Sequence, residues 1–382
     1  MTEPPPLLRK PLQRLGQLAG GLGVLLLAAW TIGHVVTDRW YLTQFLWWLP
    51  TPLVLLSCIG AGVTWRVLAP GRVRQVKPDF TNAEGAAAKF AASRVQWLYV
   101  AAVVLTGVYV GATEWRLDNV FRAPAAPSAD GVRVVAWNES WEPMKPMFDR
   151  LVGLKADIMM MANPHWTFDV VKYRASMGEP NFSVRGGNLA LFSRYPIRRS
   201  GYCDLRITPE PNRPDFPAQA KGPPDTGNAM WVELEVPEFG RPIVVWCIDM
   251  PSDPWLDRAR AFREARAAID AFRGPVMERL ENGLDKPRPL DDRAIGFPDP
   301  DMILGDCNTP RGSWSLTLLH PGMHNAFDDA GYGPAYTYPR SYPIIAIDQM
   351  MLSEHLRADE YRIIDMHGSR HRAQFGLIHA AK

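Results

Sequence analysis

Three long runs without a charged side chain occupy the first third of the chain and limit what it can fold into. They extend over about 15–36, 42–64 and 95–113. A helix needs about 20 consecutive apolar residues to cross a bilayer, and each run is close to that length. We therefore predict three transmembrane helices within a membrane anchor at 1–118. A cleavable secretory signal is the alternative for the first run, but two further runs follow it without an obvious small-residue cleavage site.

The basic residues around these runs predict the side of the membrane on which each loop lies. Three basic residues precede the first run and six lie between the second and third, whereas the first connecting loop contains only Arg39. Lys and Arg are retained on the cytoplasmic side. The N-terminus is therefore expected in the cytoplasm, and the part after Arg116 is expected to be periplasmic or extracellular. The spans carry no buried charge that would form an ion pathway, which disfavours a transporter.

A Pro/Ala-rich stretch at 119–130 separates the anchor from the rest of the chain. Such a composition is semi-extended and does not pack a core, so it is predicted to be a linker. The chain has 382 residues, and the portion at 131–382 has the size of one large α/β domain. The formal net charge is +2, which excludes a strongly basic nucleic-acid binder and gives no specific nucleic-acid signal.

The apolar pattern of this domain favours strands over helices. Strands are predicted at 132–137, 157–161, 188–193, 229–236, 243–248, 302–305, 346–352 and 375–378. Helices are predicted at 144–154 and 256–272, and the Arg/Glu run of the second helix is expected to face solvent. Strands that return at long intervals predict an α+β fold with two sheets packed face to face and helices outside them.

A short polar cluster follows the predicted strand at 302–305. Side chains alternate between the faces of an extended chain, so Asp306 and Asn308 are expected to project together and Cys307 to project away. A carboxylate beside an amide at a strand end can hold a water nucleophile or a phosphoryl oxygen. The same residue types also favour a capped turn, so the cluster alone leaves both interpretations open.

Other short motifs accompany this cluster in a fixed order. They are Trp137-Asn138, Arg185-Gly186-Gly187-Asn188, Ala346-Ile347-Asp348-Gln349-Met350 and Gly368-Ser369-Arg370-His371. In this order and spacing, residues 131–382 resemble the endonuclease/exonuclease/phosphatase superfamily, which includes metal-dependent nucleases, sphingomyelinases and inositol-phosphate phosphatases. The resemblance implies a four-layer α/β/β/α sandwich that hydrolyses phosphodiester or phosphomonoester bonds. Several bacterial members have similar spans before this domain, which implies an integral protein of a bacterial inner or cell membrane.

The resemblance also implies roles for individual residues. Asn138 is similar to the asparagine that contacts both phosphate and metal at the end of the first strand. Asp306 and Asn308 are similar to the pair that positions the nucleophile and the phosphoryl group. Asp348 and His371 are similar to the acid/base dyad, in which the carboxylate orients the imidazole and raises its basicity.

Three departures from the family pattern affect the expected metal site. Asn163 stands in place of the glutamate that is the principal magnesium ligand, and Asp249 stands in place of a phosphate-binding histidine. Arg370 replaces the aspartate of the usual Ser-Asp-His. Magnesium is held through one or two carboxylates with waters and substrate oxygens, so the lost glutamate and the added cation weaken an ordinary magnesium site.

Two interpretations follow from these departures. In the first, the domain is a phosphoesterase in which Arg370, Asn138 and Asn188 bind the phosphoryl oxygens, since a guanidinium binds phosphate through two parallel hydrogen bonds. The reaction then proceeds either with Mg²⁺ or another divalent cation, whose binding Asn163 and Arg370 weaken, or without a metal, and a phosphate ester of unspecified class is the expected substrate. The metal ligands expected in that case are Asn138, Asn163, Asp249 and Asp306. In the second interpretation, the domain is a catalytically inactive binding or scaffold module.

The sequence leaves open whether the cysteines outside the predicted spans form a disulfide. Cys247 has the same strand parity as Asp249, whereas Cys307 has the opposite parity to Asp306. Regular strands would therefore direct these two thiols to different faces. A disulfide among Cys203, Cys247 and Cys307 is disfavoured but open outside the cytoplasm.

Overall fold

The chain folds into two compact units. A computed structural model describes residues 6–69, 83–121, 131–142, 147–165, 177–178, 180–209, 225–279, 285–288 and 296–381. The first unit consists of Met1–Thr37 and Phe45–Glu114, and the second of Asp38–Gln44 and Trp115–Lys382. The segment Asp38–Gln44 thus groups with the second unit, although it lies within the predicted anchor at 1–118. Most of the predicted linker, residues 122–130, lies outside the described residues.

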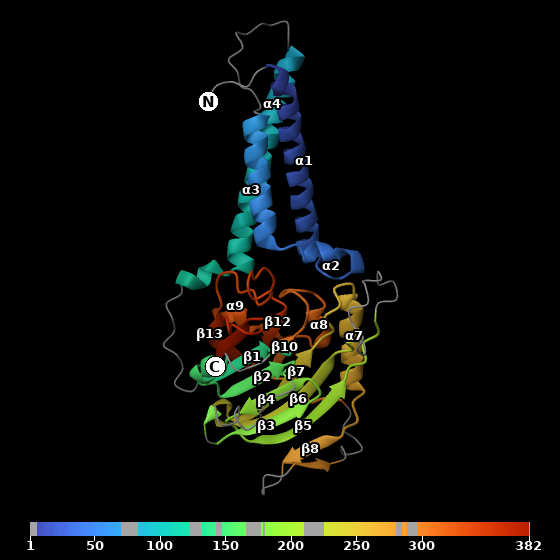
Figure 1. The fold of residues 1–382 in the computed structure, drawn as a ribbon, viewed down its shortest axis with the longest axis vertical. Helices are drawn as coiled ribbons and strands as arrows, with labels where there is room; N and C mark the ends of the chain where they lie inside the picture. Colours follow the sequence, from blue (N-terminus) through green and yellow to red (C-terminus); the bar gives the residue numbers. More distant parts are fainter. Residues whose placement is uncertain are drawn as a thin grey trace. The chain divides into compact units, whose positions relative to one another are not determined.

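Three apolar helices form the first unit (Figure 1). They are α1 (Pro6–Val36), α3 (Thr51–Leu68) and α4 (Ala83–Tyr109), the last followed by the π-helical turn η1 (Val110–Glu114). The segments long and apolar enough to cross a membrane are Lys10–Val36, Thr51–Leu68 and Arg94–Glu114. Close packing of α1 on α3 depends on Gly20, where an added Cβ would lie 2.3 Å from the Trp65 ring. The three predicted apolar helices are confirmed.

The second apolar helix begins later than predicted. The run at 42–64 is divided into α2 (Tyr41–Trp47) and α3, with Pro50 as the N-cap of α3 and Pro52 in its first turn. Proline lacks the backbone N–H that a continuous helix needs and clashes with the preceding turn, but it is favoured in the first turn of a helix. The two prolines therefore end one helix and start the next.

A small polar cluster joins the helices of the first unit. The ring nitrogen Nε2 of His34 lies 2.6 Å from Oε1 of Glu114, and the Thr51 hydroxyl donates to the same oxygen at 3.2 Å. The Trp30 indole donates to the Thr51 hydroxyl at 3.1 Å. Because these residues come from α1, α3 and η1, their hydrogen bonds hold the three segments together.

Two mixed sheets form the second unit (Figure 1). The strand order is β13-β14-β1-β2-β4-β3 in one sheet and β11-β12-β10-β7-β6-β5-β8-β9 in the other. The first sheet contains β1 (Val132–Asn138), β2 (Ile158–Ala162), β3 (Phe182–Gly186), β4 (Leu189–Ser193), β13 (Leu356–Ile364) and β14 (Ala373–Ala380). The second contains β5 (Ile197–Asp204), β6 (Asn228–Val236), β7 (Arg241–Asp249), β8 (Val276–Arg279), β9 (Asp285–Arg288), β10 (Met302–Asp306), β11 (His324–Asn325) and β12 (Asp348–Leu352).

Helical segments accompany the sheets. They are η2 (Leu117–Phe121), α5 (Phe148–Gly153), η3 (Pro237–Phe239), α7 (Arg258–Asp270), α8 (Leu316–Leu319) and α9 (Ala326–Ala330). The predicted helix at 144–154 corresponds to α5, and residues 143–146 lie outside the described part of the chain. The predicted helix at 256–272 corresponds to α7, which begins where the Asp257 carboxylate accepts a hydrogen bond from the backbone N–H of Arg260.

Strand alternation divides the apolar side chains among separate cores. Ala136 and Leu304 lie in a core between the sheets, with side chains from β1, β2, β4, β6, β7, β10 and β12. Trp246 faces α7 in a second core, and Val135 faces α5 in a third. Helix, sheet, sheet and helix therefore form four layers, which confirms the predicted α+β sandwich.

Candidate active site

Aligned strand ends bring polar residues together at one edge of the sandwich. Asp306 ends β10, where its register partners are Asp249 at the end of β7 and Asp348 at the start of β12. In the other sheet, Asn138 ends β1, and Asn163 directly follows the parallel neighbour β2. The three carboxylate residues are only 2 to 4% exposed. Three acidic side chains are therefore buried in adjacent positions.

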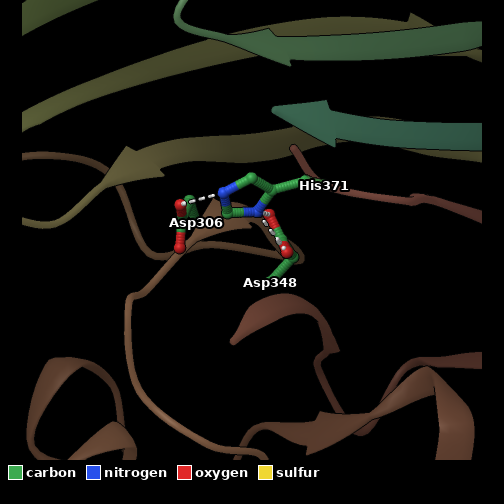
Figure 2. Close-up of side chains that lie close together, drawn as sticks. All are labelled: Asp306, Asp348 and His371. Atoms are coloured by element: carbon green, nitrogen blue, oxygen red, sulfur yellow. Dashed lines mark hydrogen bonds and ion pairs between the residues drawn. The ribbon is translucent and has the colours of Figure 1, made fainter. Parts of the chain in front are cut away.

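His371 lies between two of these carboxylates (Figure 2). Its Nδ1 atom is 2.9 Å from Oδ2 of Asp348, and its Nε2 atom is 3.8 Å from Oδ2 of Asp306. Potential ligand atoms of these three residues lie within 4.8 Å of one another. The His371 side chain is 7% exposed, and the centroid of its ring is 4.9 Å from that of Tyr338. The predicted pairing of Asp348 with His371 is therefore present in the structure.

Burial and the neighbouring charges determine the protonation states of His371 and Asp306. Burial alone would lower the pKa of His371, but the carboxylates of Asp348 and Asp306 outweigh it and raise the pKa to about 9. Burial and the neighbouring Asp348 carboxylate raise the pKa of Asp306 to about 7, although the His371 cation opposes this. Between these two values, the imidazole is a cation and the Asp306 carboxyl is an anion.

Amide groups orient the Asp306 carboxylate. The side-chain amide of Asn138 donates to Oδ2 at 2.7 Å, and the backbone N–H of Asn308 donates to Oδ1 at 2.8 Å. The side chain of Asn308 instead donates to the carbonyl of Met250 at 2.8 Å. Regular strand alternation does not extend to Asn308, because β10 ends at Asp306 and Asn308 has a left-handed φ of 46°.

A second group of amides surrounds Asp249. The Asn163 amide donates to both carboxylate oxygens at 3.3 Å, and the Asn188 amide donates to Oδ2 at 2.5 Å. Burial, together with the Asp306 and Asp225 carboxylates, raises the pKa of Asp249, while the two amides oppose the shift. The Asn163 amide also contacts Oδ1 of Asn138 at 3.4 Å, which connects this group to Asp306.

Arg370 lies outside this buried cluster. Its neighbours Ser369 and His371 are buried, whereas Arg370 is exposed. Within the described part of the chain, no hydrogen bond joins its guanidinium to Asp306, Asp348 or His371. Arg370 instead lines a pocket of about 360 Å³, whose other lining residues are Glu142, Tyr338, Pro339, Arg340, Ser341, His367, Gly368 and Ser369.

Two buried polar residues near the site, Glu139 and Ser369, had no role in the sequence prediction. Glu139 is fully buried, its Oε1 atom has no partner among the described residues, and burial raises its pKa to about 7 despite a hydrogen bond from the His165 N–H. The Ser369 hydroxyl donates to the Asn138 carbonyl at 2.5 Å, which holds the segment before His371 against β1. No sequence pattern indicates that Ser369 is buried or which carbonyl it contacts. The position of Glu139 directly after Asn138 is the signal that could have identified it.

The donor set fits a hard divalent cation. Carboxylate and amide oxygens are the ligands that Mg²⁺ prefers, and Asp249, Asp306 and Asn188 supply them together. The Oδ1 atom of Asn188 is buried without a hydrogen-bond partner among the described residues. A cation at this position would also offset the repulsion between Asp249 and Asp306. The glutamate of the family pattern remains absent, since Asn163 donates its amide to Asp249.

Asp249→Asn is expected to stabilise the protein, and the gain should increase with pH. The pKa of Asp249 is raised from 3.8, so the folded state binds the proton more tightly than the unfolded state. Stability is therefore lost as the pH rises from 3.8 towards the folded-state pKa, and asparagine removes this loss. We expect a gain of about 1–3 kcal/mol at pH 8. Thermal unfolding at pH 5 and pH 9 measures it.

A matched variant controls for this stability experiment. The side chain of Asp299 is 89% exposed, so Asp299→Asn removes the same charge without removing a buried carboxylate. Its Tm should stay close to that of the wild type at both pH values, because the exposed ion pair that Asp299 forms with His320 contributes little to stability. A loss of stability in Asp249→Asn at pH 9 would contradict the description of Asp249 as an unfavourably buried anion.

Comparisons with known proteins give matches only at the level of structure. No family model matches the chain, and no curated protein matches it. An endonuclease/exonuclease/phosphatase from Bacteroides vulgatus aligns over 66% of this chain and 99% of its own, at 14% identity and a TM-score of 0.43. A mannosyl-6-phosphatase from Bacteroides thetaiotaomicron aligns over 65% and 99%, at 12% identity and a TM-score of 0.43.

A human protein gives a similar match. The catalytic domain of human Nocturnin aligns over 66% of this chain and 95% of its own, at 14% identity and a TM-score of 0.42. Likeness at such identities concerns the fold and not the activity. The sandwich itself is defined by the strand order of the two sheets, and it is the fold that the sequence resemblance implied.

Proposed function

We propose that the protein is a membrane-anchored phosphate-ester hydrolase with its reaction centre at Asp306, Asp348 and His371. The observation that carries the proposal is the buried imidazole held between two carboxylates. An imidazole oriented by one carboxylate and paired with a second, less acidic carboxyl is suited to move protons at neutral pH.

Each residue has a distinct part in the proposed reaction. Asp348 accepts the Nδ1–H of His371, which fixes the ring and leaves Nε2 directed towards Asp306. Asp306, with a pKa of about 7, removes a proton from the attacking water. The water oxygen forms a bond to phosphorus while the bond to the leaving oxygen breaks. The His371 cation donates the Nε2 proton to that leaving oxygen, so that water is added across the ester.

The amide-rich side of the site is suited to the metal and the phosphoryl group. Mg²⁺ would be held by the Asp249 carboxylate and the Oδ1 atom of Asn188, and would neutralise developing charge on the phosphoryl oxygens. Asn138 and Asn188 also remain the proposed phosphate-binding residues. Their amide groups already donate to the buried carboxylates of Asp306 and Asp249.

The placement of the domain outside the cytoplasm is supported by chain connectivity. Asp38–Gln44 follows the first apolar helix, and the segment from Trp115 follows the third. Both belong to the compact unit that contains the two sheets, so both are proposed to lie on one side of the bilayer. The basic residues before the first helix favour the opposite side as the cytoplasmic side. The domain is therefore proposed to be periplasmic or extracellular.

Arg370→Ala is expected to weaken binding of substrates that carry a second anionic group. The pocket lined by Arg370 and Arg340 adjoins His371 through Tyr338, so a phosphate or carboxylate next to the scissile ester can reach it. Loss of one charge-assisted hydrogen bond corresponds to an increase in KM of about tenfold or more. Steady-state kinetics with singly and doubly charged esters measures the change.

Arg206→Ala is the matched control for the pocket variant. The Arg206 side chain is 87% exposed and lies outside the pocket, and its replacement removes the same charge. It should leave KM unchanged for both kinds of ester. Equal KM values for wild type and Arg370→Ala with the doubly charged ester would exclude Arg370 from substrate binding.

An activity screen of the full-length chain in detergent micelles tests the proposed function. The substrates are bis-p-nitrophenyl phosphate, p-nitrophenyl phosphate, nucleic acid and phospholipid head groups, each with Mg²⁺, Mn²⁺ or a chelator. We expect turnover of at least one ester in the presence of a divalent cation and its loss in His371→Gln. If the wild type and the variant are equally inert in every mixture, the domain is an inactive binding module.

A further inference from the structure

The segment Asp38–Gln44, between the first and second apolar helices, is packed as part of the sandwich unit. Two of its polar side chains are almost completely buried there, with Asp38 at 1% and Gln44 at 0% exposure. Burying a polar or charged side chain is costly unless it is hydrogen-bonded. The contacts of Asp38 and Gln44 therefore indicate what this segment does in the domain.

Asp38 is held by the segment that precedes α8. Its carboxylate accepts a hydrogen bond from the backbone N–H of Ser315 at 3.1 Å, and a second from the Ser315 hydroxyl. Burial raises the pKa of Asp38 although both of these hydrogen bonds oppose the shift. The guanidinium of Arg39 lies 5.9 Å from the centre of the Trp314 ring. Neighbouring residues of the segment thus contact the same part of the domain.

Gln44 contacts the start of α7 with both ends of its amide. Its Nε2 atom donates to the carbonyl of Leu256 at 3.2 Å, and its Oε1 atom accepts from the backbone N–H of Arg258 at 3.1 Å. The first N–H groups of a helix have no partner within the helix. Gln44 supplies one of these missing partners from a segment 214 residues earlier in the chain.

Arg258 connects this contact to the candidate active site. It was expected on a solvated helix face, but it is 1% exposed. Its guanidinium donates to the carbonyls of Pro251 at 2.7 Å and Asp253 at 2.8 Å. These residues follow Met250, whose carbonyl accepts the Asn308 side-chain amide and whose N–H donates to the carbonyl of Asp306. Hydrogen bonds, together with the covalent chain through Arg258 and residues 250–253, therefore connect Gln44 to the segment that bears Asp306.

From these contacts we infer that Asp38 and Gln44 are positioning residues for the proposed hydrolase. This inference rests on the proposed function. The segment between the first two apolar helices contacts the ends of the loops that follow β7 and β10, and these two strands end at Asp249 and Asp306. Displacement of a catalytic group by about 1 Å can reduce a rate by about a hundredfold. The segment Asp38–Gln44 thus supports the site as well as connecting the first two apolar helices.

Gln44→Ala in the full-length protein tests the inference. We expect kcat to fall at least tenfold with little change in KM, because the substrate contacts remain while the reacting groups lose their exact spacing. Gln44→Glu keeps an acceptor for the Arg258 N–H and should recover part of the lost kcat. Thr43→Ala is the control, since the Thr43 hydroxyl bonds to the backbone of Trp40 within the same segment. This control should have the kcat of the wild type.

Two measurements that do not depend on enzymatic activity test the inference separately from the proposed function. Backbone hydrogen exchange at 250–258 should become faster in Gln44→Ala and remain unchanged in Thr43→Ala. Asp38→Cys combined with Ser315→Cys should form a disulfide on oxidation, because the native side chains are in hydrogen-bond contact. This second measurement applies even if Gln44→Ala fails to fold.

The outcomes distinguish the two claims. Turnover in the wild type together with unchanged kcat and exchange in Gln44→Ala would overturn the inference and leave the proposed function intact. If the wild type has no activity, while the double-cysteine protein crosslinks and the wild-type amides at 250–258 exchange slowly, the proposed function is overturned. The positioning role, which rests on that function, is then overturned as well. Failure of the double-cysteine protein to crosslink would overturn the docking of the segment itself.

Discussion

His371→Gln is expected to lower kcat by about a hundredfold to ten-thousandfold, the usual contribution of a positioned acid–base group. Glutamine fills similar space and can still donate a hydrogen bond to Asp348, but it cannot carry a proton to the leaving oxygen. The protonated imidazole is available in the wild type because two carboxylates raise the pKa of His371 to about 9. Initial rates with the ester identified in the substrate screen measure this loss.

His379→Gln provides the control for this variant. His379 lies on β14, and its Nδ1 atom is 3.2 Å from Oδ1 of Asp359, so it forms another histidine–aspartate pair in the same domain. It takes no part in the proposed reaction, and its replacement should leave kcat at the wild-type value. A His371→Gln protein that retained wild-type turnover would remove His371 from the reaction.

Asp348→Asn is expected to reduce kcat by a similar factor, about a hundredfold or more, and also to shift the dependence of activity on pH. Asparagine cannot stabilise the imidazolium and can favour the wrong tautomer of the ring. In the wild type, activity should rise as Asp306 loses its proton near pH 7 and fall as His371 loses its proton near pH 9. The expected profile is therefore bell-shaped, with its maximum between these values.

The direction of the shift follows from the charge that is removed. The Asp348 carboxylate raises the pKa of both Asp306 and His371. Without it, both limbs of the profile should move to lower pH. Rates measured from pH 5 to pH 10 in wild type and Asp348→Asn test this expectation. An unchanged alkaline limb would show that His371 is not the group whose deprotonation stops the reaction.

Much of the fold could be predicted because its signals are local. Uncharged runs of sufficient length predicted the apolar helices, and apolar β-rich runs such as 302–305 predicted the buried strands. The missed strands lie mostly nearer the sheet edges, where polar residues alternate with apolar ones, as in β5. The start of the second helix was misplaced because hydropathy ignores the backbone restriction at Pro50.

The candidate site was only partly predictable from the sequence. The motifs containing Asp306, Asp348 and His371 identified groups that the structure brings together. Short motifs could not give the direction of a single side chain, so Arg370 was expected at the phosphoryl group and is instead exposed in a neighbouring pocket.

The contacts between residues far apart in the sequence could not have been predicted from the sequence. Gln44 contacts Arg258 across 214 residues, and nothing in either local sequence indicates a partner. Arg258 also begins a helix whose pattern resembles a solvated face, although a buried cation is needed there to bind two carbonyls. Such contacts depend on tertiary packing, which local patterns do not encode.

Titration of His371 by nuclear magnetic resonance, on full-length protein labelled with nitrogen-15 at histidine, tests the central claim most directly. Comparison with His371→Gln assigns the signal of this imidazole. We expect a pKa of about 9, because the ring is held between Asp306 and Asp348. A pKa at or below the ordinary histidine value of about 6.5 would contradict the proposed proton-transfer centre.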